Sequence, residues 1–418
     1  MATYQWIGDP TGSFGNQHNW FNNTDSKFND GVPGAGDTAT IANATSITLG
    51  GGAAVANLMV SGVPKLTGDL TVTGELIGGD LVGGAVEAGT MLRSIFAGKS
   101  LTADTIDDHT ELNSGTVQAK LLGLATINGA TVTADRIARG TAGDPCGIIV
   151  TGGALTAGTL TLSDASAAVG FADSFEITGG RATVSGPATV TGNNSAAGAD
   201  LTSLIATGGQ LNLAGGMLLS GAGLFNDETG AKTTAHELVA GEKGSGTVNV
   251  FGTGSVLTVA ADLILGDKGN GVLTVGQGGA VIVSGDLDAA KKAGSTSTMT
   301  VSDAGAVMTI HGEWQLGLAG TATATIHQAV PVQAEGGVSL GVEASGNGTL
   351  TMSDADTVLA IGTGEVKIGD AGTGAPDGAE RGDPRRRRKR CDGGRRGEVD
   401  RHLDGDRQSQ RIDGRGLD

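Results

Sequence analysis

The sequence contains very few aromatic residues, which make up 3% of its 418 positions. A large globular core without Trp, Tyr and Phe would lack its bulkiest packing residues. Proline is also scarce, with 8 residues against 75 glycines. These glycines follow no strict three-residue period, which excludes a collagen triple helix. Small and β-branched residues must therefore fill the interior, and this favours thin repeating layers over one large core.

Cysteines are scarce, and long apolar runs are missing. Cys146 and Cys391 are the two cysteines, and the second lies in a C-terminal segment of different composition. No disulfide framework can therefore hold the fold together. The chain has no run of 18 apolar residues, and its first residues lack the basic and apolar regions of a signal peptide. If the protein is exported, we expect its export signal to lie outside this sequence.

The formal net charge of −17 is unevenly distributed along the chain. The segment from Ala375 onward holds 13 of the 27 basic residues but 10 of the 44 acidic ones. The residues before it therefore carry the whole excess of negative charge. Such a field repels nucleic acid and anionic lipid and keeps a sheet-rich chain soluble. We therefore expect no nucleic-acid partner.

The most informative feature is an internal repeat between about residues 240 and 370. Similar strand-like segments end every 25 or 26 residues, at Val250, Val275, Val301, Ile326 and Met352. Each unit contains three short runs with the alternation of a half-buried strand, joined by Gly, Asp and Asn. The repeat predicts an all-β fold, a right-handed parallel β-helix (β-solenoid) with three short strands per coil of about 25 residues.

The same pattern of short alternating runs, in a less regular form, extends the predicted solenoid over residues 41–374. Longer excursions are expected near residues 103–115 and 221–236. Residues 1–40 differ because they concentrate Trp and Phe, and we expect them to form a cap over the open end of the first coil. The alternative for this segment is a carbohydrate-binding aromatic platform.

The repeat stops at Ala375, and the basic run 385–390 follows. A disordered basic tail and a nucleic-acid-binding patch are two interpretations of residues 375–418. A third is a change of reading frame. Codons for residues 375–384, read one nucleotide later, permit x-Leu-Thr-Val-x-Ser-Gly-Ala-Thr, which supplies the missing strand and turn. We therefore expect residues 375–418 to be a frameshifted, disordered tail without function.

Residues 244–257 and 263–275 resemble the repeat of autotransporter-type passenger domains, which are bacterial surface β-helix proteins. Trp6, Asn19-Trp20, Pro33 and Asp37-Thr38-Ala39 are similar to the segment that opens many such proteins. The resemblance implies export, display at the cell surface or outside the cell, and adhesion. It also implies attachment to the outer membrane through a C-terminal barrel, which we expect outside this sequence.

Several motifs resemble functional sites but lack part of the required pattern. Gly98-Lys99-Ser100 lacks the upstream glycine of a phosphate-binding loop, because Arg93 stands there. The acidic turns 241–244, 266–269 and 369–372 lack the calcium-binding nonapeptide pattern and are interpreted as solvated turns. Asp107-Asp108-His109 holds paired carboxylates of the type that cleaves polysaccharides, but no second acidic cluster follows one coil away.

His311, His327 and Cys146 have no partners in the sequence that indicate a metal site or a nucleophile. We predict no catalytic, cofactor-binding or metal-binding residue. The expected function is a structural or adhesive cell-surface solenoid without catalysis, binding host, matrix or neighbouring-cell ligands, as a monomer or by self-association. The alternative is a polysaccharide-degrading β-helix enzyme, a lyase or a phage tail-spike depolymerase.

Overall fold

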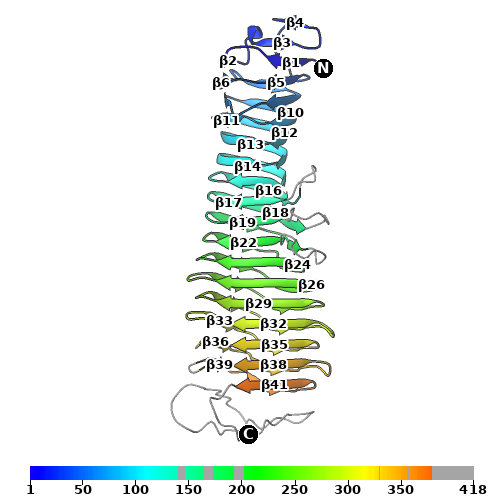
Figure 1. The fold of residues 1–418 in the computed structure, drawn as a ribbon, viewed down its shortest axis with the longest axis vertical. Coiled ribbons are helices and arrows are strands. Elements are labelled where there is room, and N and C mark those ends of the chain that lie inside the picture. Colours follow the sequence, from blue (N-terminus) through cyan, green and yellow to red (C-terminus); the bar gives the residue numbers. More distant parts are fainter. Residues whose placement is uncertain (140–145, 164–172, 193–201, 329, 355–356, 379–418) are drawn as a thin grey trace. The chain divides into compact units, whose positions relative to one another are not determined.

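The computed structural model describes residues 1–139, 146–163, 173–192, 202–328, 330–354 and 357–378. These residues form 41 β-strands and one short 3₁₀ helix, and no α-helix occurs among them. No helix in these ranges is long and apolar enough to cross a membrane. The all-β class expected from the sequence is confirmed. Figure 1 shows the strands stacked as successive parallel rungs within each part of the chain.

The chain divides into two compact units. Unit 1 comprises Met1–Thr161 with Asp173–Thr183, and unit 2 comprises Val184–Asp418 with Leu162–Ala172. The strands that lie wholly or mostly in unit 1 are β1 (Thr3–Trp6), β2 (Thr11–Ser13), β3 (Trp20–Asn22), β4 (Lys27–Phe28), β5 (Thr38–Ile41), β6 (Ser46–Thr48), β7 (Ala53–Val55), β8 (Asn57–Val60), β9 (Lys65–Thr67), β10 (Leu70–Ile77), β11 (Asp80–Val82), β12 (Ala85–Leu92), β13 (Ile95–Asp107), β14 (Thr110–Leu122), β15 (Leu124–Ile127), β16 (Thr131–Ile137), β17 (Gly147–Val150), β18 (Ala154–Ser163), β19 (Ser174–Ile177) and β20 (Arg181–Val184).

The strands of unit 2 are β21 (Ala188–Thr191), β22 (Ser203–Thr207), β23 (Gln210–Leu213), β24 (Met217–Glu228), β25 (Lys232–Ala235), β26 (Leu238–Phe251), β27 (Val256–Val259), β28 (Leu263–Leu265), β29 (Asn270–Gly276), β30 (Ala280–Val283), β31 (Leu287–Ala289), β32 (Thr296–Val301), β33 (Val307–Ile310), β34 (Trp314–Leu316), β35 (Thr321–Ile326), β36 (Pro331–Ala334), β37 (Gly337–Leu340), β38 (Asn347–Met352), β39 (Val358–Ile361), β40 (Glu365–Ile368) and β41 (Thr373–Gly378).

The apolar column predicted from the repeat of unit 2 is confirmed. Its members are direct parallel register partners from one rung to the next, in the order Val250, Val275, Val301, Ile326 and Met352. The first four side chains are fully buried. From β27 onward, each strand up to β38 pairs in parallel with the third strand after it. Burying like residues upon like residues along each column fills the interior without large aromatic side chains.

In much of unit 1 the coil is shorter than the 25 residues expected from the sequence. Val86, Leu101, Val117 and Val132 are successive register partners only 15 or 16 residues apart. The reason is the length of the strands: β13 and β14 each contain 13 residues, so that one strand can pair with two others. β14, for example, pairs with both β15 and β16. A chain that bends within a strand needs fewer turn residues to complete a rung.

The excursions expected near residues 103–115 and 221–236 are largely wrong. Residues 103–115 lie in β13 and β14 except for a two-residue turn, and residues 221–236 lie mostly in β24 and β25. Polar side chains in these segments alternate with buried apolar ones, so the alternation of a strand is present but weakened.

The start of unit 1 is an aromatic cluster. The Trp20 side chain is fully buried and makes edge-to-face contacts with Trp6 and Phe14, at ring-centroid distances of 5.2 and 4.9 Å. Its indole N–H donates to the Phe14 carbonyl oxygen at 2.8 Å. Strands β1, β3 and β4 pair antiparallel here, while β1 continues in parallel onto β5.

At the other end of the described residues, β41 pairs with β38 in unbroken register, and Met352 lies opposite Gly378. The last strand therefore continues four residues past Gly374, the position where the repeat was expected to stop. The remainder of the expected tail, residues 379–418, lies outside the described residues.

Candidate functional site

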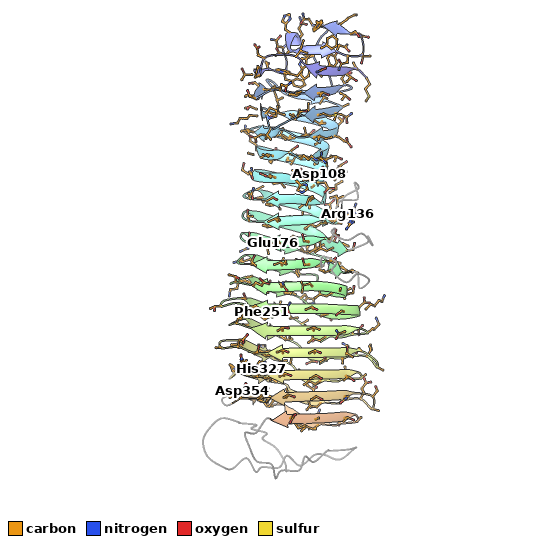
Figure 2. All side chains as sticks on the ribbon, in the orientation of Figure 1. Asp108, Arg136, Glu176, Phe251, His327 and Asp354 are labelled. Atoms are coloured by element: carbon orange, nitrogen blue, oxygen red, sulfur yellow. The ribbon has the colours of Figure 1, made fainter. Side chains whose placement is uncertain are left out.

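The acidic pair considered for polysaccharide cleavage lies at the turn between β13 and β14. The Asp107 side chain is buried, and its carboxylate accepts a hydrogen bond of 2.7 Å from the Leu124 backbone N–H on the next rung. Asp108 instead forms an ion pair of 2.6 Å with Arg93. Asp108 and His109 both have positive φ, and Figure 2 labels Asp108 at this turn. Both carboxylates are therefore engaged in holding the turn.

Gly98-Lys99-Ser100 lies inside strand β13 rather than in a loop. The Lys99 backbone N–H donates to the Gly84 carbonyl oxygen at 2.8 Å, so it is not directed at a ligand. A phosphate-binding loop needs consecutive free N–H groups that converge on one anion. This strand offers no such arrangement.

Two of the three acidic segments of unit 2 are joined by an ion pair, and the first of them, residues 241–244, lies within β26 and not in a turn. Lys268 lies 3.7 Å from Glu242 and 3.4 Å from Asp267 beside it. Lysine ammonium groups thus lie where a calcium ion would need further oxygen ligands. Within the described ranges, no three His, Cys, Asp or Glu side chains gather closely enough to hold a metal ion.

The isolated histidines and the cysteine are dispersed through the fold. His311 lies 2.8 Å from a Glu335 carboxylate oxygen on the next rung, and the two side chains are about half exposed. His327 follows the end of β35 and is labelled in Figure 2 at the edge of unit 2. Cys146 is fully buried, and burial is the main reason that the pKa of its thiol is raised. A thiol of this kind is a poor nucleophile.

Most of the N-terminal aromatic side chains are buried and form no exposed platform. Trp6, Phe14 and Trp20 are buried in the cluster described above, and Tyr4 is also buried. Phe28 on β4 is 68% exposed, and its ring centroid lies 4.7 Å from that of the half-buried Phe21. Sugar rings stack on open aromatic faces, and the four buried rings present none.

The outward side of four strands in unit 2 forms a flat, uncharged surface that we call the threonine face. Its members are the outward residues of β29, β32, β35 and β38, namely Asn270, Val272, Thr274, Thr296, Thr298, Thr300, Thr321, Thr323, Thr325, Asn347, Thr349 and Thr351. Register places like residues on adjacent rungs, as with Thr298 opposite Thr323. The repeat sequence contains these threonines, but only the register shows that they share one face.

Sequence reasoning missed a buried carboxyl group in the interior of unit 2. Asp227 lies between Ala206 and Val250 in the column that is otherwise apolar, and its side chain is fully buried. Burial raises its pKa to about 7. Asn226-Asp227-Glu228 looks like a polar loop in the sequence, so its strand position was not predicted.

A comparison with family models, with curated proteins and with solved structures finds no match to this chain. The function therefore has to be inferred from the geometry described above.

Proposed function

We propose that this chain is a structural and adhesive surface solenoid, an autotransporter-type passenger without catalytic activity. The proposal includes the finer fold: a right-handed β-solenoid whose rungs from β27 onward each contain three short strands. Parallel strands joined by a crossover are right-handed in nearly all known cases, and the pairing of each strand with the third one after it fits three strands per rung.

The observation that carries the proposal is the threonine face. It presents no charged side chain on four successive rungs, although the chain as a whole has a net charge of −17. Adjacent rungs lie roughly 4.8 Å apart, so hydroxyl and methyl groups recur at a regular spacing. A large, flat, repetitive surface suits weak contacts summed over a wide area, as in adhesion to matrix, to host surfaces or to neighbouring cells.

The alternative, a polysaccharide-degrading enzyme, receives less support from the acidic pair at the β13–β14 turn. Asp107 is bound to the backbone of the next rung, and Asp108 is bound to Arg93. Paired acid and base groups need at least one carboxyl free to reach the substrate. These contacts favour a structural role for both residues.

Adhesion can be tested with the purified chain on surfaces coated with matrix proteins or acidic polysaccharides, and on bacterial cells. Thr298→Lys with Thr323→Lys places two charges on the threonine face and should reduce binding. Thr309→Lys, on the outward side of β33, is the matched control and should retain binding. Equal binding by the wild type and both variants, or loss of polysaccharide viscosity on incubation, would overturn the proposal.

Localisation needs a separate experiment. The intact gene should encode an outer-membrane barrel downstream, and external protease should remove the passenger from whole cells. A protein protected from protease in intact cells, and released only on lysis, would contradict surface display.

A further inference from the structure

The interior of unit 2 contains a polar layer formed by β24 and β25. Asp227 occupies the column that holds Val250 on the next rung, and Thr233 occupies the column of Leu211 and Leu257. Asp227 is fully buried and Thr233 is 1% exposed. Two polar side chains on the same rung therefore replace two apolar ones.

The two polar side chains do not satisfy each other. Among the described residues, neither carboxyl oxygen of Asp227 nor the Thr233 hydroxyl has a hydrogen-bond partner of ordinary geometry. The side chain and the backbone N–H of Thr233 lie near the carboxyl group and lower its pKa. Neither of these two groups forms a hydrogen bond of ordinary geometry with it. An ionised carboxylate in this position would be costly, because a buried charge needs partners that compensate its lost hydration.

Other charges near Asp227 are few. Lys232 at the start of β25 favours the ionised form, and Glu228 next to it on β24 disfavours it. The neighbouring β22, β23 and β27 contain no titratable side chain, and the part of β26 that pairs with Asp227 contains none either. Desolvation is consequently the largest influence on this carboxyl group.

We propose that the β24–β25 rung is a proton-gated weak point of unit 2, packed tightly while Asp227 is protonated and opening locally when Asp227 ionises. The inference is independent of the proposed surface function, because it concerns the interior alone. A rung in a repeat protein contacts only its neighbours, so one layer can open without unfolding the rest.

The direction of the pH effect follows from linkage. The pKa of Asp227 is about 7 in the folded chain and near its ordinary value of 3.8 once the rung opens. Its contribution to stability is therefore complete below about pH 3.8 and is lost as the pH rises through 7. Between pH 5.5 and 8.5 the opening equilibrium constant should increase about 30-fold.

Hydrogen exchange measured by mass spectrometry tests this on the full chain. Peptides from residues 217–235 are compared between the wild type and Asp227→Asn at pH 5.5 and at pH 8.5, so that intrinsic exchange rates cancel at each pH. The wild type should lose protection about 30-fold relative to the variant at the higher pH. Peptides from β32 and β35, whose strands hold no carboxyl group, should show no such difference.

Two further variants keep the test decisive. Asp227→Val matches Val250 in the same column and replaces Asp227→Asn if the amide prevents folding. Asp370→Asn removes an exposed carboxyl group and should exchange like the wild type at both pH values. If the wild type and the Asp227 variants respond to pH in the same way, the β24–β25 rung is not proton-gated and the proposal fails.

Discussion

The carboxylate of Asp107 and the backbone N–H of Leu124, 17 residues apart, are joined by a partly buried hydrogen bond of 2.7 Å. Asp107 is the last residue of β13 and Leu124 is the first residue of β15. The bond satisfies a backbone donor where β15 begins, at a corner that the regular strand pairing does not cover. It gives Asp107 a structural contact with the start of β15.

Asp107→Ala should therefore destabilise unit 1 by about 2 kcal/mol, because a partly buried N–H loses its charged partner. Asp107→Asn should recover most of this loss, since an amide oxygen can accept the same bond. Asp108→Asn should cost about 0.5 kcal/mol, because the Arg93 side chain in its ion pair is largely exposed. Urea unfolding followed by circular dichroism measures all three, and well-folded Asn variants that lose a depolymerase activity would support the enzyme instead.

Cys146 should be unreactive in the folded protein. Its thiol is fully buried, and burial followed by the nearby Asp173 and Asp107 carboxylates raises its pKa, so thiolate is disfavoured. In a Cys391→Ser background, we expect a disulfide exchange reagent at pH 8 to label Cys146 about 100-fold more slowly than in 8 M urea, a rough ratio for a thiol exposed only by opening. Rapid labelling of the folded chain would instead indicate an accessible, activated thiol.

Small residues recur at one position in unit 2 because two backbone segments approach closely there. The column runs through Gly246, Gly271, Ser297, Ala322 and Gly348. A Cβ atom on Gly271 would collide with backbone atoms of Gly266 and Leu265, which belong to the preceding turn and strand. Backbone cannot move aside as a flexible side chain can.

Gly271→Ala should therefore destabilise unit 2 by about 3 kcal/mol, as overpacking against backbone does. The reverse change in the same column, Ala322→Gly, should cost about 1 kcal/mol through added chain entropy. Urea midpoints of the two variants provide the comparison. Equal losses would mean that the column tolerates a Cβ atom at every rung.

The part of the fold that the sequence predicted is the part where spacing is regular. The column from Val250 to Met352 follows from a repeat of 25 or 26 residues, and the register confirms it. The shorter rungs of unit 1 were not predicted, because β13 and β14 shift register within a strand, near Gly98 and Gly115, and not at a separate turn between two strands. Alternation shows that a strand is present, not where it changes direction.

The candidate sites were harder to judge from sequence, because partners belong to neighbouring rungs. Neither the contact of Asp107 with Leu124 nor that of Glu242 with Lys268 can be read from local sequence. Asp227 was missed because its immediate sequence neighbours are themselves misleading. Its polar neighbours Asn226 and Glu228 face outward in a strand, and together the three residues resemble a loop.

The reading-frame interpretation of the tail now makes a prediction about two positions. Pro376 pairs with Leu350 and Gly378 pairs with Met352, so both occupy columns that are apolar on earlier rungs. The shifted frame permits Leu at position 376 and Val at position 378, which are residues suited to these columns. Proline also removes a backbone donor from the strand.

Pro376→Leu combined with Gly378→Val should stabilise unit 2 by about 1 to 2 kcal/mol through apolar burial on Leu350 and Met352. Ala375→Leu adds a similar apolar side chain on the outward side, next to Thr349, and should give no gain. Urea unfolding measures both variants, and sequencing the gene tests the frame directly. The interpretation is wrong if the double variant is no more stable than Ala375→Leu and the DNA does not encode Leu-Thr-Val in the shifted frame. The tail would then be a native part of the protein.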